Sequence, residues 1–190
     1  MGLRDVTIKI PAKDVVDRYM QVLPRAAHHA ETYLQTIQSR VGEQQIAVSV
    51  TRQKATASFF GRLGGGESRD VLVVVPLNSE LGDYTMYHYS APSGLNLAVG
   101  WCVTQRGAAR DNALNSLGSA LKGGFGAAAG VAGIASLFGS LDMWELADLE
   151  AIISGIHQFA VMDAVYYIAN DVKFDAERIT TKSAGFFGIG

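Results

Sequence analysis

Between residues 44 and 103, apolar runs alternate with short turn signals, and this spacing constrains the fold more than any other feature of the chain. The connections are too short for the crossover helix that a parallel strand pair needs. The segment therefore predicts a five-stranded antiparallel meander. The strand candidates are QQIAVSV (44–50), ATASFFGRL (55–63), DVLVVVPL (70–77), YTMYHYS (84–90) and LNLAVGWCV (95–103), separated by glycine, proline, asparagine and serine turn residues.

The residues before this meander predict one short strand and two helices. Val6, Ile8 and Ile10 alternate with polar residues and end at Pro11, as a strand does. Apolar residues between Val15 and Leu23 recur at helical spacing and stop near Pro24. A second helix is expected over about 25–40, with Gly42 after it. This mixture of helices and an antiparallel sheet places the chain in the α+β class.

The opening segment, VTIKIPAKDVVDRYMQVL (6–23), is similar to the first strand and helix of the helix-grip folds, the START and polyketide-cyclase-like group. These folds hold apolar ligands, so the resemblance implies a carrier whose sheet curls around an apolar small molecule or lipid. Four aromatic residues of the predicted strands are candidates to line such a pocket: Phe59, Tyr87, Tyr89 and Trp101.

A segment of 19 residues, GGFGAAAGVAGIASLFGSL (123–141), carries no charge and six glycines. Gly123, Gly126, Gly130 and Gly133 follow a 3-4-3 spacing, which places them on one face of a helix. Such a smooth face lets another backbone approach closely, as in membrane helix dimers. A close-packed helix in a soluble core, a membrane-active helix and a glycine-rich linker all remain open.

The residues after the glycine stripe complete a predicted helical hairpin. An apolar helix is expected over 151–170, and the acidic run DMWELADLE (142–150) would form the tip between the two limbs. Helix packing or membrane contact is expected to involve Phe125, Phe138 and Trp144 together with the stripe glycines. We divide the chain into an α+β head (1–110), the hairpin (111–172) and a C-terminal tail (173–190).

Charge and motifs argue against several function classes. The net charge of −2 over 190 residues supplies no basic field for nucleic acid. The single Cys102 excludes an internal disulfide framework and a cysteine-based zinc cage. On a helix, the adjacent His28 and His29 would point about 100° apart, so no metal site is predicted. No nucleophile–base pair or cofactor motif stands out, so catalytic residues and cofactors are not predicted.

These observations favour a non-enzymatic protein that self-assembles or interacts with membranes through the glycine-striped hairpin. A homo-oligomer is the expected partner, and a membrane or lipid is a second. The charged start of the chain, with no apolar signal region, indicates the cytoplasm, with membrane attachment open. A helix-grip-like carrier of an apolar molecule and an enzyme without a recognisable motif are the alternatives.

Overall fold

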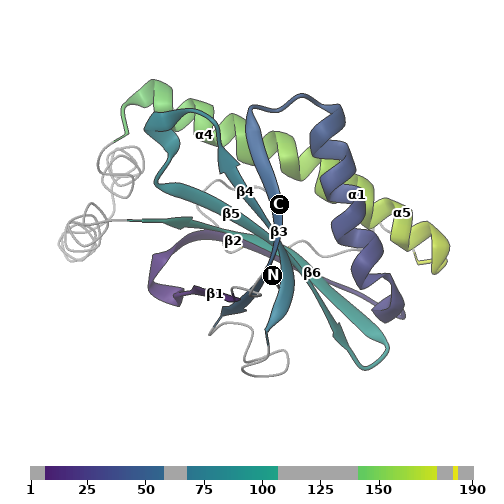
Figure 1. Cartoon of the computed structure of the whole chain (residues 1–190). Coiled ribbons are helices and arrows are strands. Elements are labelled where there is room, and N and C mark those ends of the chain that lie inside the picture. Colours follow the sequence, from purple (N-terminus) through teal and green to yellow (C-terminus); the bar gives the residue numbers. More distant parts are fainter. Residues whose placement is uncertain (1–6, 58–67, 107–140, 175–181, 184–190) are drawn as a thin grey trace, which may run out of the picture.

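The computed structural model describes residues 7–57, 68–106, 141–174 and 182–183, which form a twisted sheet with helices across one face (Figure 1). The α+β class is confirmed. The strands are β1 (Thr7–Ile10), β2 (Val15–Leu23), β3 (Val48–Ala57), β4 (Arg69–Pro76), β5 (Tyr84–Ser93), β6 (Asn96–Gln105) and the two-residue β7 (Lys182–Ser183). The helices are α1 (Ala30–Glu43), α4 (Met143–Ile156) and α5 (Met162–Asp171), with short turns at η1 (Ala12–Asp14), η2 (Ala27–His29) and η4 (Ser79–Leu81) and a π-helical turn at η5 (His157–Val161).

The sheet has the strand order β1-β3-β4-β5-β6-β2-β7, and β3 to β6 form an antiparallel meander of four strands where five were expected. The prediction of separate strands over 44–50 and 55–63 is wrong, because β3 runs unbroken from Val48 to Ala57. Polar residues such as Arg52 interrupt its apolar pattern, but their backbones pair with β4 in continuous register. The sheet is also mixed, since β1 pairs with β3 in parallel.

The prediction of a helix between Val15 and Leu23 is also wrong, because this segment is β2, antiparallel to β6. Its inward side chains include Asp17 and Gln21, which are buried, while Val22 points outward and is half exposed. Because polar residues occur on its buried face and apolar residues on its exposed face, β2 lacks the alternation of apolar and polar residues by which a strand is recognised. Pairing with β6, from Val15 opposite Thr104 to Leu23 opposite Leu97, decides the conformation.

The sheet curls, because β1 and β2 belong to opposite sides of its strand order and yet only four residues separate them. A compact apolar cluster fills the inside of the curl. Its buried members are Ile10, Ala55, Val71, Val73, Tyr89 and Cys102. The sheet therefore has an apolar centre on both faces, which agrees with the unbroken valine run of β4.

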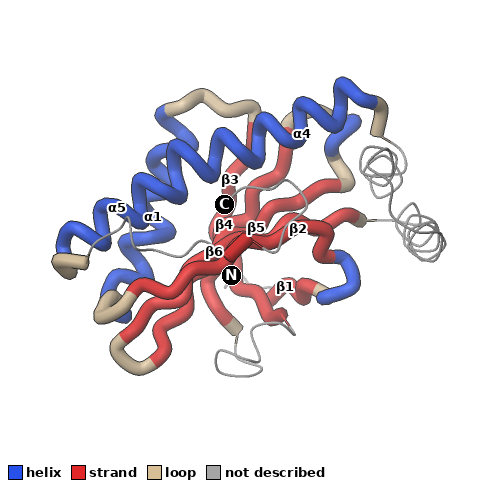
Figure 2. Tube along the Cα trace, turned by 180° about the vertical axis from the view of Figure 1, so that it is seen from behind, coloured by secondary structure: helices blue, strands red, loops and turns tan. Residues whose placement is uncertain are grey.

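The opposite face of the sheet is covered by α1 and by the long helix that runs through α4, η5 and α5 (Figure 2). Tyr33 and Ile37 of α1 and Ile153 of α4 belong to the same buried cluster as Leu72 and Trp101 of the sheet. This packing buries one side of the long helix and leaves the other side in solvent.

The prediction that residues 142–150 form the tip of a helical hairpin is wrong. They begin the long helix: Asp142 accepts hydrogen bonds from the backbone N–H groups of Trp144 and Glu145, and its own backbone N–H donates one to the Glu145 carboxylate. This reciprocal capping satisfies the free N–H groups at a helix start. The predicted second helix between β2 and β3 is present as α1, whereas residues 123–140 of the glycine stripe lie outside the described residues.

Candidate functional site

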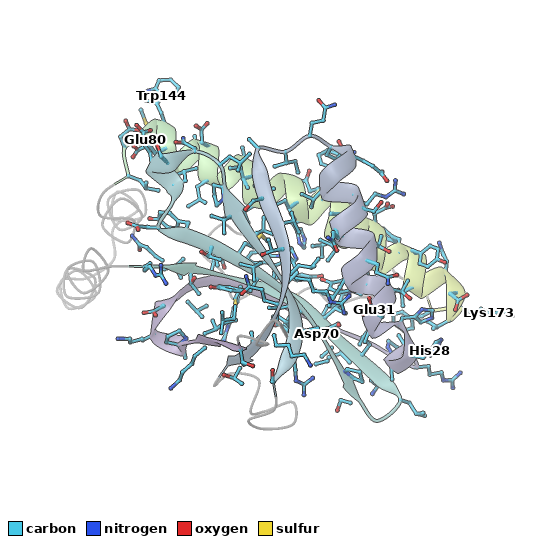
Figure 3. The ribbon with its side chains drawn as sticks, viewed as in Figure 1. His28, Glu31, Asp70, Glu80, Trp144 and Lys173 are labelled. Carbon is cyan, nitrogen blue, oxygen red and sulfur yellow. The ribbon has the colours of Figure 1, made fainter. Side chains whose placement is uncertain are left out.

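The outer side of the long helix carries five large apolar side chains in solvent. Met143, Trp144, Phe159, Tyr166 and Tyr167 are 76%, 75%, 55%, 45% and 60% exposed, and we call them the helix face. Figure 3 shows Trp144 pointing away from the body at the start of the helix. Two of the five lie at the start of the helix and three in its second half. Aromatic residues gain much from burial against a partner, so we treat these exposed side chains as a candidate interaction surface.

The long helix is acidic. Residues 142–171 hold six carboxylates and no lysine or arginine. Arg40 of α1 contacts one of them, because its Nε lies 2.6 Å from Oδ2 of Asp163. The carboxylates of the first half, at Asp142, Glu145, Asp148 and Glu150, give the start of the helix face a negative surrounding. A partner surface should therefore be apolar with a positive rim.

A second exposed apolar surface lies on the other side of the sheet. Met20 and Val22 of β2 are 42% and 50% exposed, and we call these two with the exposed Arg18 the β2 row. They alternate with Tyr19 and with the other β2 residues that pack beneath the helices, so they point to the opposite face. Residues 1–110, which contain the β2 row, hold 12 basic and nine acidic side chains, a sign opposite to that of the long helix.

Beneath the long helix, the sheet presents a buried row of polar and aromatic side chains. His88, Trp101 and Tyr19 face one another across β5, β6 and β2 at one register level. His157, the first residue of the π-helical turn, completes this group: its Nδ1 accepts a hydrogen bond of 3.1 Å from Trp101 Nε1, and its ring lies edge-on to Tyr19 at 4.6 Å between centroids. His157 is thus held between the long helix and the sheet.

Burial keeps both of these histidines neutral. It lowers the pKa of His88 to about 3, with a further contribution from His157, and it lowers the pKa of His157 to about 4. Within the described part of the chain, neither ring nitrogen of His88 has a hydrogen-bond partner. Two uncharged imidazoles in a closed interior lack the access to solvent and substrate that acid–base catalysis requires.

Among the described residues, one hollow between the long helix and the sheet is too small for a ligand. A void of about 10 Å³ lies among Val74, Met86, Val103, Leu149 and Ile153, which is about the least space that a single water needs. The predicted lining residues that the structure describes lie on two faces of the sheet. Trp101 is buried beneath the helices, Tyr87 and Tyr89 lie with the cluster inside the curl, and Phe59 lies outside the described residues.

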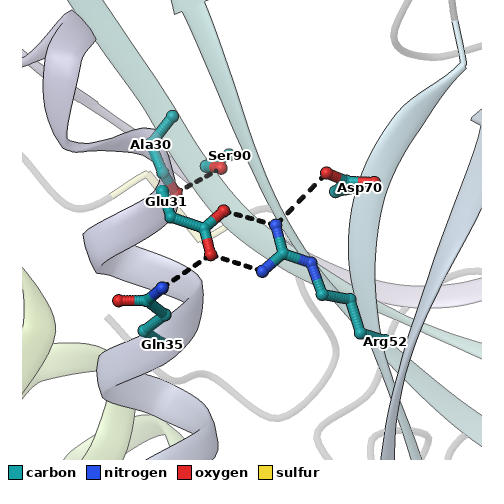
Figure 4. Close-up of polar contacts among 6 residues, drawn as sticks. All are labelled: Ala30, Glu31, Gln35, Arg52, Asp70 and Ser90. Atoms are coloured by element: carbon teal, nitrogen blue, oxygen red, sulfur yellow. Dashed lines mark hydrogen bonds and ion pairs between the residues drawn. The ribbon is translucent and has the colours of Figure 1, made fainter.

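An open hollow of about 460 Å³ lies beside the start of α1. It is lined in part by Arg52, Glu31, Asp70 and Ser90. Arg52 bridges both carboxylates, with two hydrogen bonds to Glu31 and one of 3.2 Å to Asp70 (Figure 4). The paired guanidinium lowers the pKa of Glu31, and these hydrogen bonds raise the pKa of Arg52. The hollow thus contains a satisfied ion pair, and its Arg52 is engaged by the chain itself.

The structure brings together only part of what the sequence singled out. Trp144 belongs to the exposed helix face, whereas the stripe glycines, Phe125 and Phe138 lie outside the described residues. The β2 row was missed because its residues were assigned to a helix. His157 was missed because nothing in its local pattern indicates a contact with Trp101, 56 positions away.

Comparisons with known proteins add no identification: no family model, curated protein or solved structure matches this chain. The long helix, Met143–Asp171, is the one described helix that is long and apolar enough to cross a membrane; the most apolar 18-residue window has a mean hydropathy of 1.2 and is 44% buried in the fold. The core helix of a soluble protein meets the same criterion, so the helix face has to be judged by its contacts and charges.

Proposed function

We propose that the protein is a non-enzymatic self-assembling module, in which the helix face of one copy binds the β2 row of the next. The observation that carries this proposal is the pair of exposed apolar surfaces with opposite charge surroundings: Trp144 and Phe159 within an acidic helix, Met20 and Val22 beside Arg18. Apolar residues then supply affinity, and the charges select the register and orientation of the contact.

The contact has to join two copies. The helix face and the β2 row lie on opposite sides of the sheet, so they cannot meet within one chain. An interface between two different surfaces of the same chain is heterologous, and it produces a ring or a filament according to the rotation between neighbours. The expected solution behaviour is therefore a concentration-dependent series of oligomers.

The charges of the long helix favour a protein partner over a membrane. The six carboxylates of residues 142–171, with no lysine or arginine among them, oppose an anionic lipid surface. Insertion across a bilayer would also place Asp163 and His157 in hydrocarbon and remove the buried Ile153 and Val165 from the core of the sheet.

The test is the mass of the protein in solution as a function of concentration, measured by sedimentation velocity. The double variant Trp144→Ser, Phe159→Ser should dissociate, with the dissociation constant raised more than tenfold, because aromatic residues at the centre of an interface contribute most of its free energy. Leu77→Ser and Leu95→Ser are the matched controls, since those leucines are 66% and 76% exposed and belong to neither surface. These controls should assemble as the unaltered chain does.

A mixing experiment identifies the geometry of the contact. The variant Met20→Thr, Val22→Thr lacks the β2 row and keeps the helix face, whereas Trp144→Ser, Phe159→Ser has the opposite defect. Each should be monomeric alone, and an equimolar mixture should form a dimer that grows no further. A mixture that stays monomeric, while the unaltered chain assembles, would show that the two surfaces do not bind each other.

Three further results would overturn the proposal. One is a monomer at every concentration. Another is an oligomer that Gly126→Leu dissolves and Trp144→Ser, Phe159→Ser does not, which would assign assembly to the glycine stripe. The third is flotation of the unaltered monomer with neutral phosphatidylcholine vesicles, lost on Trp144→Ser, which would make the helix face a membrane-binding surface.

A further inference from the structure

Two histidines and an aspartate that are far apart in sequence meet at one end of the molecule. His28 and His29 belong to η2, the turn that leads into α1, and Asp171 is the last residue of α5. Nε2 of His29 lies 3.0 Å from Oδ2 of Asp171, and the ligand atoms of all three residues lie within 4.8 Å of one another. Figure 3 shows His28 at the same end of the molecule as Lys173, which follows α5.

We propose that His28, His29 and Asp171 bind a first-row divalent transition metal, with zinc as the test ion. Imidazole nitrogen and carboxylate oxygen are ligands that such ions take together. Consecutive residues of an α-helix point about 100° apart, so no metal site was expected at this pair of histidines. The pair instead lies in a 3₁₀ turn, where the two rings are 4.0 Å apart between centroids.

The spacing of the three side chains is close to that of a metal site. Neighbouring ligand atoms on a tetrahedral zinc lie about 3.3 Å apart, given bonds of roughly 2.0–2.1 Å. Nε2 of His29 and Oδ2 of Asp171 already have nearly this separation. His29 is only 9% exposed, so the surrounding residues hold its ring in place. His28 is exposed, so its ring can turn toward the other two without disturbing the core.

The charges around the site act in both directions. The carbonyl end of α5 carries a partial negative charge that favours a cation beside Asp171, whereas Lys173 two residues further on opposes it. Three protein ligands leave at least one coordination position for water or another donor. A bound ion would join the start of α1 to the end of α5, so it would stabilise the folded chain and have much lower affinity for the unfolded one.

The test measures zinc and cobalt binding to untagged protein by calorimetry and thermal unfolding. The chain used is Trp144→Ser, Phe159→Ser, which is meant to remove assembly, so that the result does not depend on the proposed function. One ion per chain is expected, with visible absorption from bound cobalt. At an ion concentration 100 times the dissociation constant, the melting temperature should rise by about 5–10 °C.

Two variants with little structural role test the ligands. His28→Ala removes an exposed imidazole, and Asp171→Asn replaces an exposed carboxylate with a weak ligand of the same shape. Each should weaken binding at least tenfold. Asp148→Asn, at an exposed carboxylate elsewhere on the long helix, is the matched control and should bind as the parent chain does.

Three results would overturn the site. They are no heat and no shift in melting temperature at millimolar zinc or cobalt, binding that survives both His28→Ala and Asp171→Asn, and one ion for every two chains. The first would leave His29 and Asp171 as a simple polar contact, and the last would assign the ion to a contact between copies.

Discussion

Lowering the pH from 7.5 to 5 should remove about 4 kcal/mol of folding free energy through His88 and His157. Both side chains are buried, at 0% and 5% exposure, and burial lowers the pKa of His88 to about 3 and that of His157 to about 4. In the unfolded chain, an imidazole has a pKa of about 6.5. As the pH falls, the unfolded chain therefore takes up protons that the folded chain does not.

The magnitude follows from the difference in bound protons. At pH 5 the unfolded chain carries nearly a full proton on each imidazole, and the folded chain carries almost none. This pH lies about 1.5 units below the pKa of the unfolded imidazole, and each unit changes the free energy of unfolding by about 1.4 kcal/mol. Each histidine therefore lowers the free energy of unfolding by about 2 kcal/mol. The contribution is fully present above about pH 6.5, and it is lost progressively as the pH falls toward the folded pKa values of about 4 and 3.

The assay is urea unfolding at pH 7.5, 6 and 5, followed by circular dichroism on the chain with Trp144→Ser and Phe159→Ser so that assembly does not contribute. In that background, His88→Leu should halve the loss to about 2 kcal/mol. It should cost little at pH 7.5, because the imidazole that it replaces makes no hydrogen bond within the described residues. His157→Gln keeps an acceptor for the Trp101 N–H, and the combined variant should show almost no dependence on pH over this range.

The result that would refute this reasoning is a His88→Leu chain that loses as much stability between pH 7.5 and 5 as its parent. Two paired carboxylates titrate at lower pH than this range. Arg52 lowers the pKa of Glu31 and Arg40 lowers that of Glu43, so their contribution to stability begins to fall only near and below about pH 4.5.

Three further substitutions test the packing of the sheet and of the long helix, and the cap at the start of that helix. Gly100→Ala would place a methyl group against the backbone oxygen of Tyr19 and 2.7 Å from the Tyr89 hydroxyl, so it should lower the free energy of unfolding by about 3 kcal/mol or more. Gly155→Ala adds a methyl group within a helix, and the nearest atom to it is 4.0 Å away. This variant should leave the free energy of unfolding unchanged or raise it by up to about 1 kcal/mol. An equal response of both variants in thermal unfolding would contradict the close contact at Gly100. Asp142→Ala should cost about 1 kcal/mol by removing the cap of α4, and an unchanged melting temperature would show that this cap does not stabilise the helix.

The spacing of apolar residues correctly predicted those helices and strands whose side chains follow a single helical or strand period and whose connections are short. Strands β4, β5 and β6 and helix α1 could be located from alternation, turn residues and helical spacing. The same method misplaced β2, because the buried Asp17 and Gln21 interrupt its alternation while its apolar residues also fit a helical period. It divided β3 in two because Arg52 and its neighbours are polar, although backbone pairing with β4 continues through them.

The candidate surfaces were predictable only in part, for a related reason. The aromatic residues of the long helix stand out in an apolar segment, so Trp144 was named from the sequence. Which side of that helix meets solvent depends on how it packs on the sheet. The β2 row depends on β2 being a strand, and the meeting of His28, His29 and Asp171 depends on a turn and on a helix end 142 residues further along.

The sequence by itself determined the α+β class, the antiparallel order of β4, β5 and β6, and the acidic, apolar composition of residues 142–171. These depend on residue types and spacings that act over a few positions. Only the tertiary structure decided that β1 and β2 lie at opposite sides of a curled sheet, that His157 meets Trp101, and that the helix face and the β2 row point in opposite directions. Each of these depends on contacts between residues far apart in the chain, and no local period encodes such contacts.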